Sequence, residues 1–228
     1  MIYPAPQVAP DVPFGAYGTY RAATDYGAPI AYPDDPRAPD AGARVHEGFF
    51  LRLSAGLGAG GTHYHERYDS ERPQRVQTEG VSTTFELAIG GALRENLILH
   101  GNVAFQNLNG STRKVDGQRD VTWDIDTGTV MLGGGLTYYV MPANVYFTGS
   151  VGVAGLAESR DHHTAFKTHA GVGSVLSFGK EWWVGAQGQW GMGAALRGSF
   201  YTANAGIFGD LTRVYAADVG LAFSATLN

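Results

Sequence analysis

The chain has 228 residues, of which 16% are charged and 33 are glycine, and it contains no cysteine. The lack of cysteine excludes a disulfide framework, a thiolate metal site and a lipidated N-terminal cysteine, and we expect no cofactor. The formal net charge of −5 gives no reason to expect nucleic acid as a partner. No run of about 18 apolar residues is present, so we expect no transmembrane helix.

Residues 1–46 differ in composition from the rest of the chain. Eight of the ten prolines lie here: Pro4, Pro6, Pro10, Pro13, Pro29, Pro33, Pro36 and Pro39. Because proline lacks a backbone donor and favours extended neighbours, we predict an extended or disordered tether. Five tyrosines on such a backbone would alternatively suit docking onto a protein or cell-wall partner. The first residues show no signal peptide, and we expect a mature, exported form.

Residues 47–228 alternate between apolar side chains and small or polar ones. In the first stretch, Phe49, Leu51, Leu53, Ala55, Leu57 and Ala59 share one face, and Phe50, Arg52, Ser54, Gly56, Gly58 and Gly60 share the other. The pattern recurs at residues 81–90, 97–106, 129–140, 145–153, 166–178, 182–192 and 213–228. Such alternation predicts strands with two different faces. Most residues on the polar face have side chains too small to form a solvated surface. Small side chains suit the inside of a narrow barrel surrounded by lipid.

The connections between these stretches alternate in length. Three are predicted tight turns, at residues 93–96, 141–144 and 179–181, and four are predicted long polar loops, at residues 62–79, 109–123, 158–164 and 197–211. Outer-membrane barrels have short periplasmic turns and long outer loops. We therefore predict an all-β fold, an eight-stranded antiparallel up-and-down transmembrane β-barrel with a Pro-rich N-terminal extension. A soluble eight-stranded barrel of the lipocalin type is the alternative.

The inward faces of the predicted strands carry a few charges. These are Arg52, Glu86, Lys167 and Asp218, with His100 and His169 beside them. Buried charges need partners, and the strand of Arg52 neighbours those of Glu86 and Asp218 in a closed barrel. We therefore predict that Arg52 contacts both carboxylates in a polar network that fills the lumen. A gated proton or ion path is the functional alternative.

The predicted loops hold two further candidate sites. Four histidines, His63, His65, His162 and His163, are weak candidates for a transition-metal site through their imidazole nitrogens. Six cations are candidates for contact with lipopolysaccharide phosphates: Arg67, Arg72, Arg75, Arg113, Lys114 and Arg119. Solvated histidines and a mixed-charge loop surface are the simpler interpretations, and we expect no bound metal.

The last stretch resembles the sorting signal of small outer-membrane barrels of the OmpA/OmpX type. Asp218, Gly220, Phe223 and Ala225 occupy its polar, glycine, aromatic and hydrophobic positions. The resemblance implies the outer membrane of a Gram-negative bacterium, both termini in the periplasm, and contact with the barrel assembly machinery, outer-membrane lipid and lipopolysaccharide.

Two classes of function follow from these observations. The first is a non-enzymatic envelope scaffold or interaction protein that meets partners through its outer loops and its Pro-rich tail. The second is a lipid A-modifying enzyme, for which Ser159, Asp161 and His162 offer the residue types of a nucleophilic site. All three lie on one predicted loop, and we expect no enzymatic activity.

Overall fold

A computed structural model describes residues 45–66, 74–115, 118–160, 163–184, 189–207 and 210–227. For several residues near the gaps the description covers the backbone alone. Most of the predicted N-terminal tether therefore lies outside the described residues. None of the described residues forms a helix long and apolar enough to cross a membrane.

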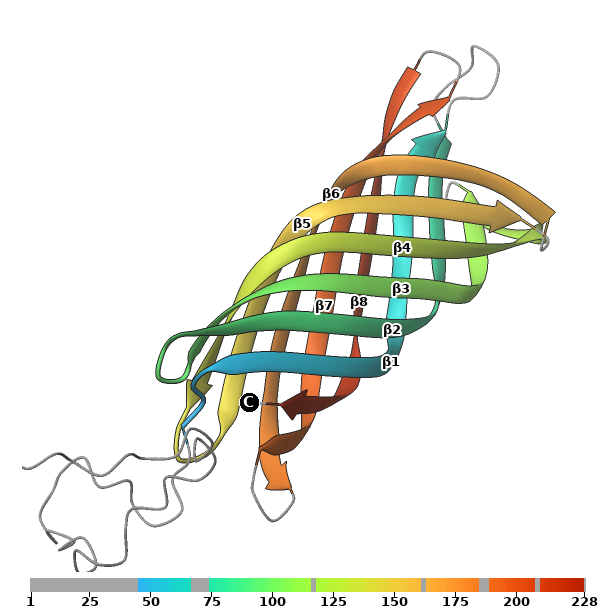
Figure 1. The fold of residues 1–228 in the computed structure, drawn as a ribbon. Coiled ribbons are helices and arrows are strands. Elements are labelled where there is room, and N and C mark those ends of the chain that lie inside the picture. Colours follow the sequence, from blue (N-terminus) through green and yellow to red (C-terminus); the bar gives the residue numbers. More distant parts are fainter. Residues whose placement is uncertain are drawn as a thin grey trace, which may run out of the picture. The chain divides into compact units, whose positions relative to one another are not determined.

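Eight antiparallel strands form a closed barrel in chain order, which confirms the predicted fold class (Figure 1). They are β1 (Phe49–Glu66), β2 (Gln74–Arg94), β3 (Leu97–Val115), β4 (Gln118–Val140), β5 (Val145–Arg160), β6 (His163–Val184), β7 (Trp190–Ile207) and β8 (Asp210–Leu227). The ring closes between the first and last strands, where Leu51 pairs with Leu227 and His63 with Tyr215. Closure leaves no sheet edge along this seam, so the backbone groups are paired as a membrane requires.

The two ends of the barrel differ. At one end, which we call the turn end, β2 joins β3 through Glu95 and Asn96, and β4 joins β5 through Met141–Asn144. Asn96 and Asn144 have positive φ angles of 63° and 52°, a conformation that asparagine tolerates better than most residues. The opposite end, the hairpin end, carries the connections after β1, β3, β5 and β7.

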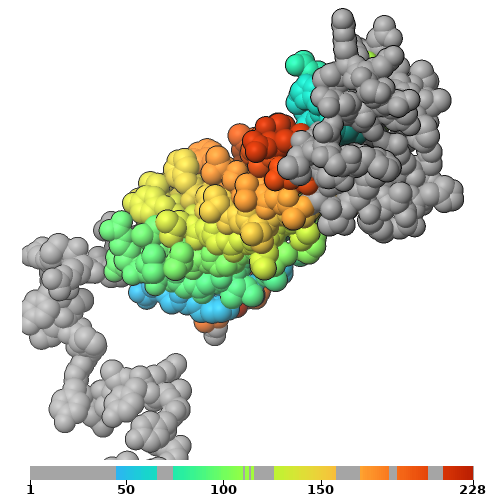
Figure 2. Space-filling view, turned by 90° about the horizontal axis from the view of Figure 1, so that it is seen from above, coloured from blue at the N-terminus to red at the C-terminus, as the bar shows by residue number. Residues whose placement is uncertain are grey.

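Large apolar side chains cover the outside of the barrel. Leu57, Leu132, Val151 and Phe223 are 61–68% exposed, whereas the inward Phe50, Met131 and Val175 are fully buried. On β3 the outward apolar run extends from Leu97 to Phe105, and on β4 from Val140 to Val130. A tilted transmembrane strand needs about 9–11 residues, which these runs match. The outer wall is therefore a lipid-facing belt, and Figure 2 shows successive strands as adjoining bands from blue through green to yellow.

The strands continue further than the sequence pattern predicts. The four predicted long loops are wrong, because β1 runs to Glu66, β3 to Val115, β5 to Arg160 and β7 to Ile207. Beyond the belt the outward side chains of a strand meet water, so they need not be apolar. The predicted loops are therefore mostly paired hairpin arms.

The predicted turn at residues 179–181 is also wrong. β6 continues to Val184, and the connection to β7 falls between Val184 and Trp190. Gly179 faces the lumen, where an added Cβ would lie 2.7 Å from the Tyr146 ring and 2.7 Å from the Ala194 carbonyl oxygen. Its small size is needed for packing inside the barrel, and no turn is formed there.

The lipid-facing belt predicts a position-dependent cost of introducing charge. We expect Val151→Arg, in the middle of the belt, to reduce the free energy of unfolding by about 2–4 kcal/mol. Asn109→Arg, on an outward position beyond the belt, should cost about 0–1 kcal/mol. Denaturant unfolding in lipid vesicles measures both, and equal losses would contradict the assignment of the outer face.

Candidate functional site

The inward face of the barrel is narrow because small residues let the strands curve tightly. Gly58 on β1 pairs with Gly220 on β8 at the closing seam. A Cβ built on either glycine would lie only 2.7 Å from the Cα of the other. The resulting lumen is small enough for side chains to meet across it, as expected for eight strands.

Near the turn end, Arg52 binds four side chains from four other strands. Its Nη2 donates to Glu181 Oε1 at 3.1 Å and to Tyr139 Oη at 2.6 Å. Its Nη1 donates to Thr148 Oγ1 at 3.0 Å, and its Nε to Thr226 Oγ1 at 3.3 Å. Arg52 is 6% exposed and Glu181 is 1% exposed, so this is a buried ion pair with its hydrogen bonds satisfied. We call these five residues the Arg52 group.

Glu181 is held as firmly as Arg52. It accepts hydrogen bonds from Thr226 Oγ1 at 2.7 Å and from Tyr139 Oη at 3.1 Å, in addition to the guanidinium. The Tyr146 ring lies under Arg52, with its centroid 4.2 Å from Cζ. Cation–π contact of this kind adds to the attraction in a desolvated site.

Further along the lumen, Arg197 on β7 lies between two carboxylates. Its Nε is 3.7 Å from Glu86 Oε2, and its Nη1 is 3.6 Å from Asp218 Oδ1. Glu86 also accepts from Asn102 Nδ2 at 2.8 Å, and Asp218 accepts from the Ser199 hydroxyl. None of the guanidinium nitrogens of Arg197 is in hydrogen-bond geometry with a described atom. We call Arg197, Glu86, Asp218, Asn102 and Ser199 the Arg197 group.

The predicted contact of Arg52 with Glu86 and Asp218 is wrong. The order of neighbouring strands is as predicted. Glu86 pairs with Ser54, the next inward position after Arg52, but its carboxylate lies against Arg197 and Asn102. The register separates Asp218 from Arg52 along the barrel. Arg52 pairs with Thr226, whereas Asp218 pairs with Gly60. Glu181 and Arg197, which sequence reasoning placed in a turn and a loop, supply the opposite charges.

The sequence pattern indicates an inward position for both Glu181 and Arg197, although the prediction missed them. Glu181 continues the inward series of Val175, Ser177 and Gly179 on β6 without a change of phase. Arg197 continues the inward series of small residues that precedes it on β7. Extending the alternation through these positions would have placed both charges in the lumen.

The other predicted members of the lumen network have different positions. His100 is 3% exposed, and its Nε2 is 3.2 Å from Thr137 Oγ1, which in turn lies 2.8 Å from Thr148 Oγ1. His100 is thereby linked to the Arg52 group. The backbones of Lys167 and His169 lie in β6 and pair with β5. Their side chains lie outside the description.

On the hairpin side of the Arg197 group, apolar side chains lie in the lumen among buried threonines such as Thr62, Thr78 and Thr127. A buried cluster there contains Tyr64, Val76, Ala104, Met131, Ala154, Leu156, Val175, Tyr201, Ala203, Val214 and Ala216. On β7, Tyr201 follows Arg197 toward the hairpin end, and on β8 Val214 lies beyond Asp218 in the same direction. The lumen is thus filled in turn by the Arg52 group, the Arg197 group and this apolar cluster.

The turn end of the lumen is covered by His46, a residue that sequence analysis assigned to the N-terminal tether. Its ring is fully buried, with its centroid 3.4 Å from that of Tyr139 and 4.7 Å from that of Trp183. His46 Nε2 lies 2.8 Å from Asn144 Oδ1, and its backbone N–H donates to Asn96 Oδ1 at 3.0 Å. The packed barrel therefore begins before residue 47, the predicted boundary.

The candidate lipopolysaccharide cations are not brought together as one described cluster. Arg75 is exposed on β2, and Lys114 on β3 pairs with Glu79 at 2.6 Å. Arg113 and Arg119 are described by backbone alone, on β3 and β4. Arg67 and Arg72 lie outside the described residues. Contact with lipopolysaccharide through these cations stays a prediction.

The candidate metal ligands are only partly described. His63 and His65 lie on β1, with ring centroids 5.3 Å apart. Partial burial, followed by the charges of Arg75 and His65, lowers the pKa of His63 below its ordinary value. His163 begins β6 with its side chain outside the description, and His162 lies outside the described residues. Among the described residues, no group of three or more possible ligands is assembled.

The predicted assembly-signal residues divide between the two faces of β8. Phe223 is 68% exposed and Ala225 is outward beside it, whereas Asp218 is 7% exposed in the lumen. Gly220 lies at the seam with β1. Recognition by the assembly machinery stays a prediction.

The nucleophilic candidates are not described as a site, since Ser159 is described by backbone alone and Asp161 and His162 are outside the described residues.

No protein-family model matches the chain, and no curated protein matches it. The chain is similar to several solved structures. Neisserial surface protein A is 12% identical with a TM-score of 0.45, over 79% of this chain and 96% of that chain. OprG from Pseudomonas aeruginosa, an outer membrane protein, is 12% identical with a TM-score of 0.42, over 78% and 97%. Ail, the attachment invasion locus protein of Yersinia pestis, is 11% identical with a TM-score of 0.36, over 78% and 99%.

The ion pair of the Arg52 group predicts a specific rescue. Arg52→Met should lower the free energy of unfolding by about 3–5 kcal/mol, because Glu181 is left as an unpaired buried charge. Adding Glu181→Gln should restore a large part of that loss, whereas adding Glu86→Gln should lower stability further. Denaturant unfolding of the single and double variants in lipid measures this. Rescue by Glu86→Gln in place of Glu181→Gln would contradict the pairing.

Proposed function

We propose that the protein is a non-enzymatic barrel of the outer membrane of a Gram-negative bacterium. It acts as an envelope scaffold that meets partners at its two ends. In this proposal the turn end and both termini face the periplasm, where the Pro-rich tail is available to a protein or the cell wall. The hairpin arms face outward.

The filled lumen is the observation that carries this proposal. Two groups of paired charges and an apolar cluster follow one another along the inside. His46 covers the turn end with a ring stacked on Tyr139. A lumen filled in this way favours a scaffold over a channel, because eight strands leave an interior just wide enough for side chains.

The hairpin arms support the second part of the proposal. On β2 the outward positions change from apolar Phe85 and Val81 to charged Glu79 and Arg75 toward the hairpin end. Paired strands that continue past the belt present polar side chains on a stiff support. Such a surface suits contact with partners or with lipopolysaccharide headgroups at low entropic cost.

A gated ion path is the second candidate, and Arg197 is the observation that favours it. Its guanidinium is 3% exposed and is held by two carboxylates at 3.6–3.7 Å without hydrogen-bond geometry to a described atom. It is therefore less tightly held than Arg52, whose nitrogens donate at 2.6–3.3 Å. A rearrangement of the lumen would begin more easily at Arg197.

Conductance in planar bilayers separates these two functions. We expect the wild-type barrel to show no discrete conductance steps in a potassium chloride solution, because its lumen is filled. Insertion is checked separately by resistance to unfolding in unboiled gel samples. If the wild type shows steps that Arg197→Met alters and Lys180→Met, on the outer face, leaves unchanged, the gated path replaces the scaffold.

A further inference from the structure

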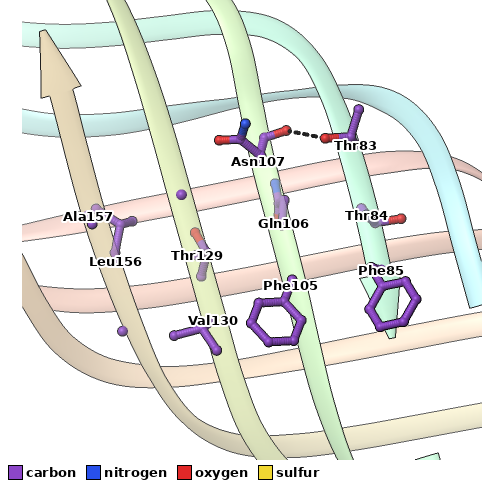
Figure 3. Close-up of a pocket in the computed structure, with 12 residues that line it drawn as sticks. Thr83, Thr84, Phe85, Phe105, Gln106, Asn107, Thr129, Val130, Leu156 and Ala157 are labelled. Atoms are coloured by element: carbon purple, nitrogen blue, oxygen red, sulfur yellow. Dashed lines mark hydrogen bonds between the residues drawn. The ribbon is translucent and has the colours of Figure 1, made fainter. Parts of the chain in front are cut away.

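The outer wall carries a groove that the lumen-based function does not use. It has a volume of about 570 Å³ and crosses β2 to β5 on the lipid side (Figure 3). Its outward-facing residues are Thr83, Phe85, Phe105, Asn107, Gly128, Val130, Gly155 and Ala157. The volume is in the range of about 300–1,000 Å³ that is usual for small-molecule sites.

Two outward glycines create the groove. A Cβ built on Gly128 would meet nothing within 4 Å, and one on Gly155 would meet only Val130 Cγ1, at 3.5 Å. Neither glycine has a positive φ angle. Unlike the lumen glycines Gly58 and Gly220, they are not required by a close approach of strands. Their lack of side chains therefore leaves a hollow beside the large apolar residues Phe85, Phe105 and Val130.

The part of the groove nearer the turn end is apolar. Phe85, Phe105 and Val130 line it, and they are 42–47% exposed toward the lipid side. They belong to the same outward runs that form the belt, so the groove is continuous with the surface that meets lipid. A molecule bound in this part leaves its contacts with bulk lipid and contacts these side chains instead. The apolar lining therefore favours a hydrocarbon chain as the ligand.

The part nearer the hairpin end is polar. Asn107 Nδ2 donates to Asn109 Oδ1 at 2.5 Å, and Asn109 Nδ2 donates to Thr83 Oγ1 at 3.5 Å. Thr83 Oγ1 donates to the Asn107 carbonyl oxygen at 3.4 Å. No described residue donates to Asn107 Oδ1, which is an acceptor at the border of the belt. A ligand that brings an N–H or O–H group to this point would donate a hydrogen bond to Asn107 Oδ1.

We infer that the groove binds one acyl chain of a glycolipid with amide-linked, hydroxylated chains, the chemistry of lipid A. The hydrocarbon lies against Phe105 and Val130 over the floor of Gly128, and the amide N–H or the hydroxyl near the head of the chain donates to Asn107 Oδ1. The ester linkages of a phospholipid supply acceptors alone at this depth, so they leave Asn107 unpaired. The inference rests on the proposed outer-membrane orientation, in which the hairpin end meets the glycolipid leaflet.

Filling the groove tests the site with a matched control. Gly128→Leu places a side chain in the hollow, whereas Gly101→Leu adds the same side chain at another outward glycine whose Cβ has no contact closer than 3.8 Å. Binding of purified lipid A to the folded barrel in dodecyl maltoside is measured by native mass spectrometry. We expect Gly128→Leu to weaken binding by about fivefold or more, because the acyl chain loses van der Waals contacts with several groove atoms, and Gly101→Leu to leave it unchanged.

The polar end is tested by Asn107→Leu, which removes the acceptor and preserves much of the volume. We expect it to weaken lipid A binding by about fivefold to tenfold, the effect of one lost hydrogen bond, and to leave unchanged the binding of phosphatidylcholine, which has no N–H or O–H donor. Equal losses for Gly128→Leu and Gly101→Leu would overturn the site. Wild-type binding of phosphatidylcholine as tight as that of lipid A would overturn the ligand class. Because binding is measured in detergent on folded barrels, failure here leaves the conductance result and the scaffold proposal standing.

Discussion

Charge pairing across a lumen that lipid surrounds is the constraint on which the rest of this structure depends. Arg52 and Glu181 are almost fully buried, and they lie on strands β1 and β6, which are not neighbours in the barrel. A charge left alone there would cost several kcal/mol. The strands must therefore be held in the register that brings opposite charges together. The hydrogen bonds from Tyr139 and Thr226 show that the surrounding polar groups are arranged around this pair.

The pairing is possible only because most inward residues are small. Gly58 and Gly220 let the closing strands curve against each other, and Gly179 leaves room for the ring of Tyr146. That ring lies under the Arg52 guanidinium. The glycine content of the chain thus supports the charged interior indirectly, by setting how close the walls of the barrel approach.

Glycine has a different effect on the outer face of the barrel. There Gly128 relieves no close contact, and the space it leaves opens toward lipid. The inner and outer faces therefore suit different roles. The inside is closed by ionic and apolar packing, which favours a rigid scaffold. The outside combines a general apolar belt with the groove whose polar end is at Thr83 and Asn107.

Local alternation determined much of this protein by itself: the eight strands, the face of each, and the inward position of Arg52, Glu86 and Asp218. It determined these because the direction of a side chain depends only on its place in a strand. The partners of those charges were decided by the tertiary structure, since the stagger of a closed barrel is set by all the strands together. Glu181 was lost to an apparent Gly-Lys turn and Arg197 to an apparent polar loop, although the outward neighbours Trp182 and Leu196 continue the apolar face of each strand. The groove was equally hidden, because Gly128 and Gly155 lie on different strands, and only the register of β4 against β5, in which Gly128 pairs with Ala157 and Val130 with Gly155, brings them close together.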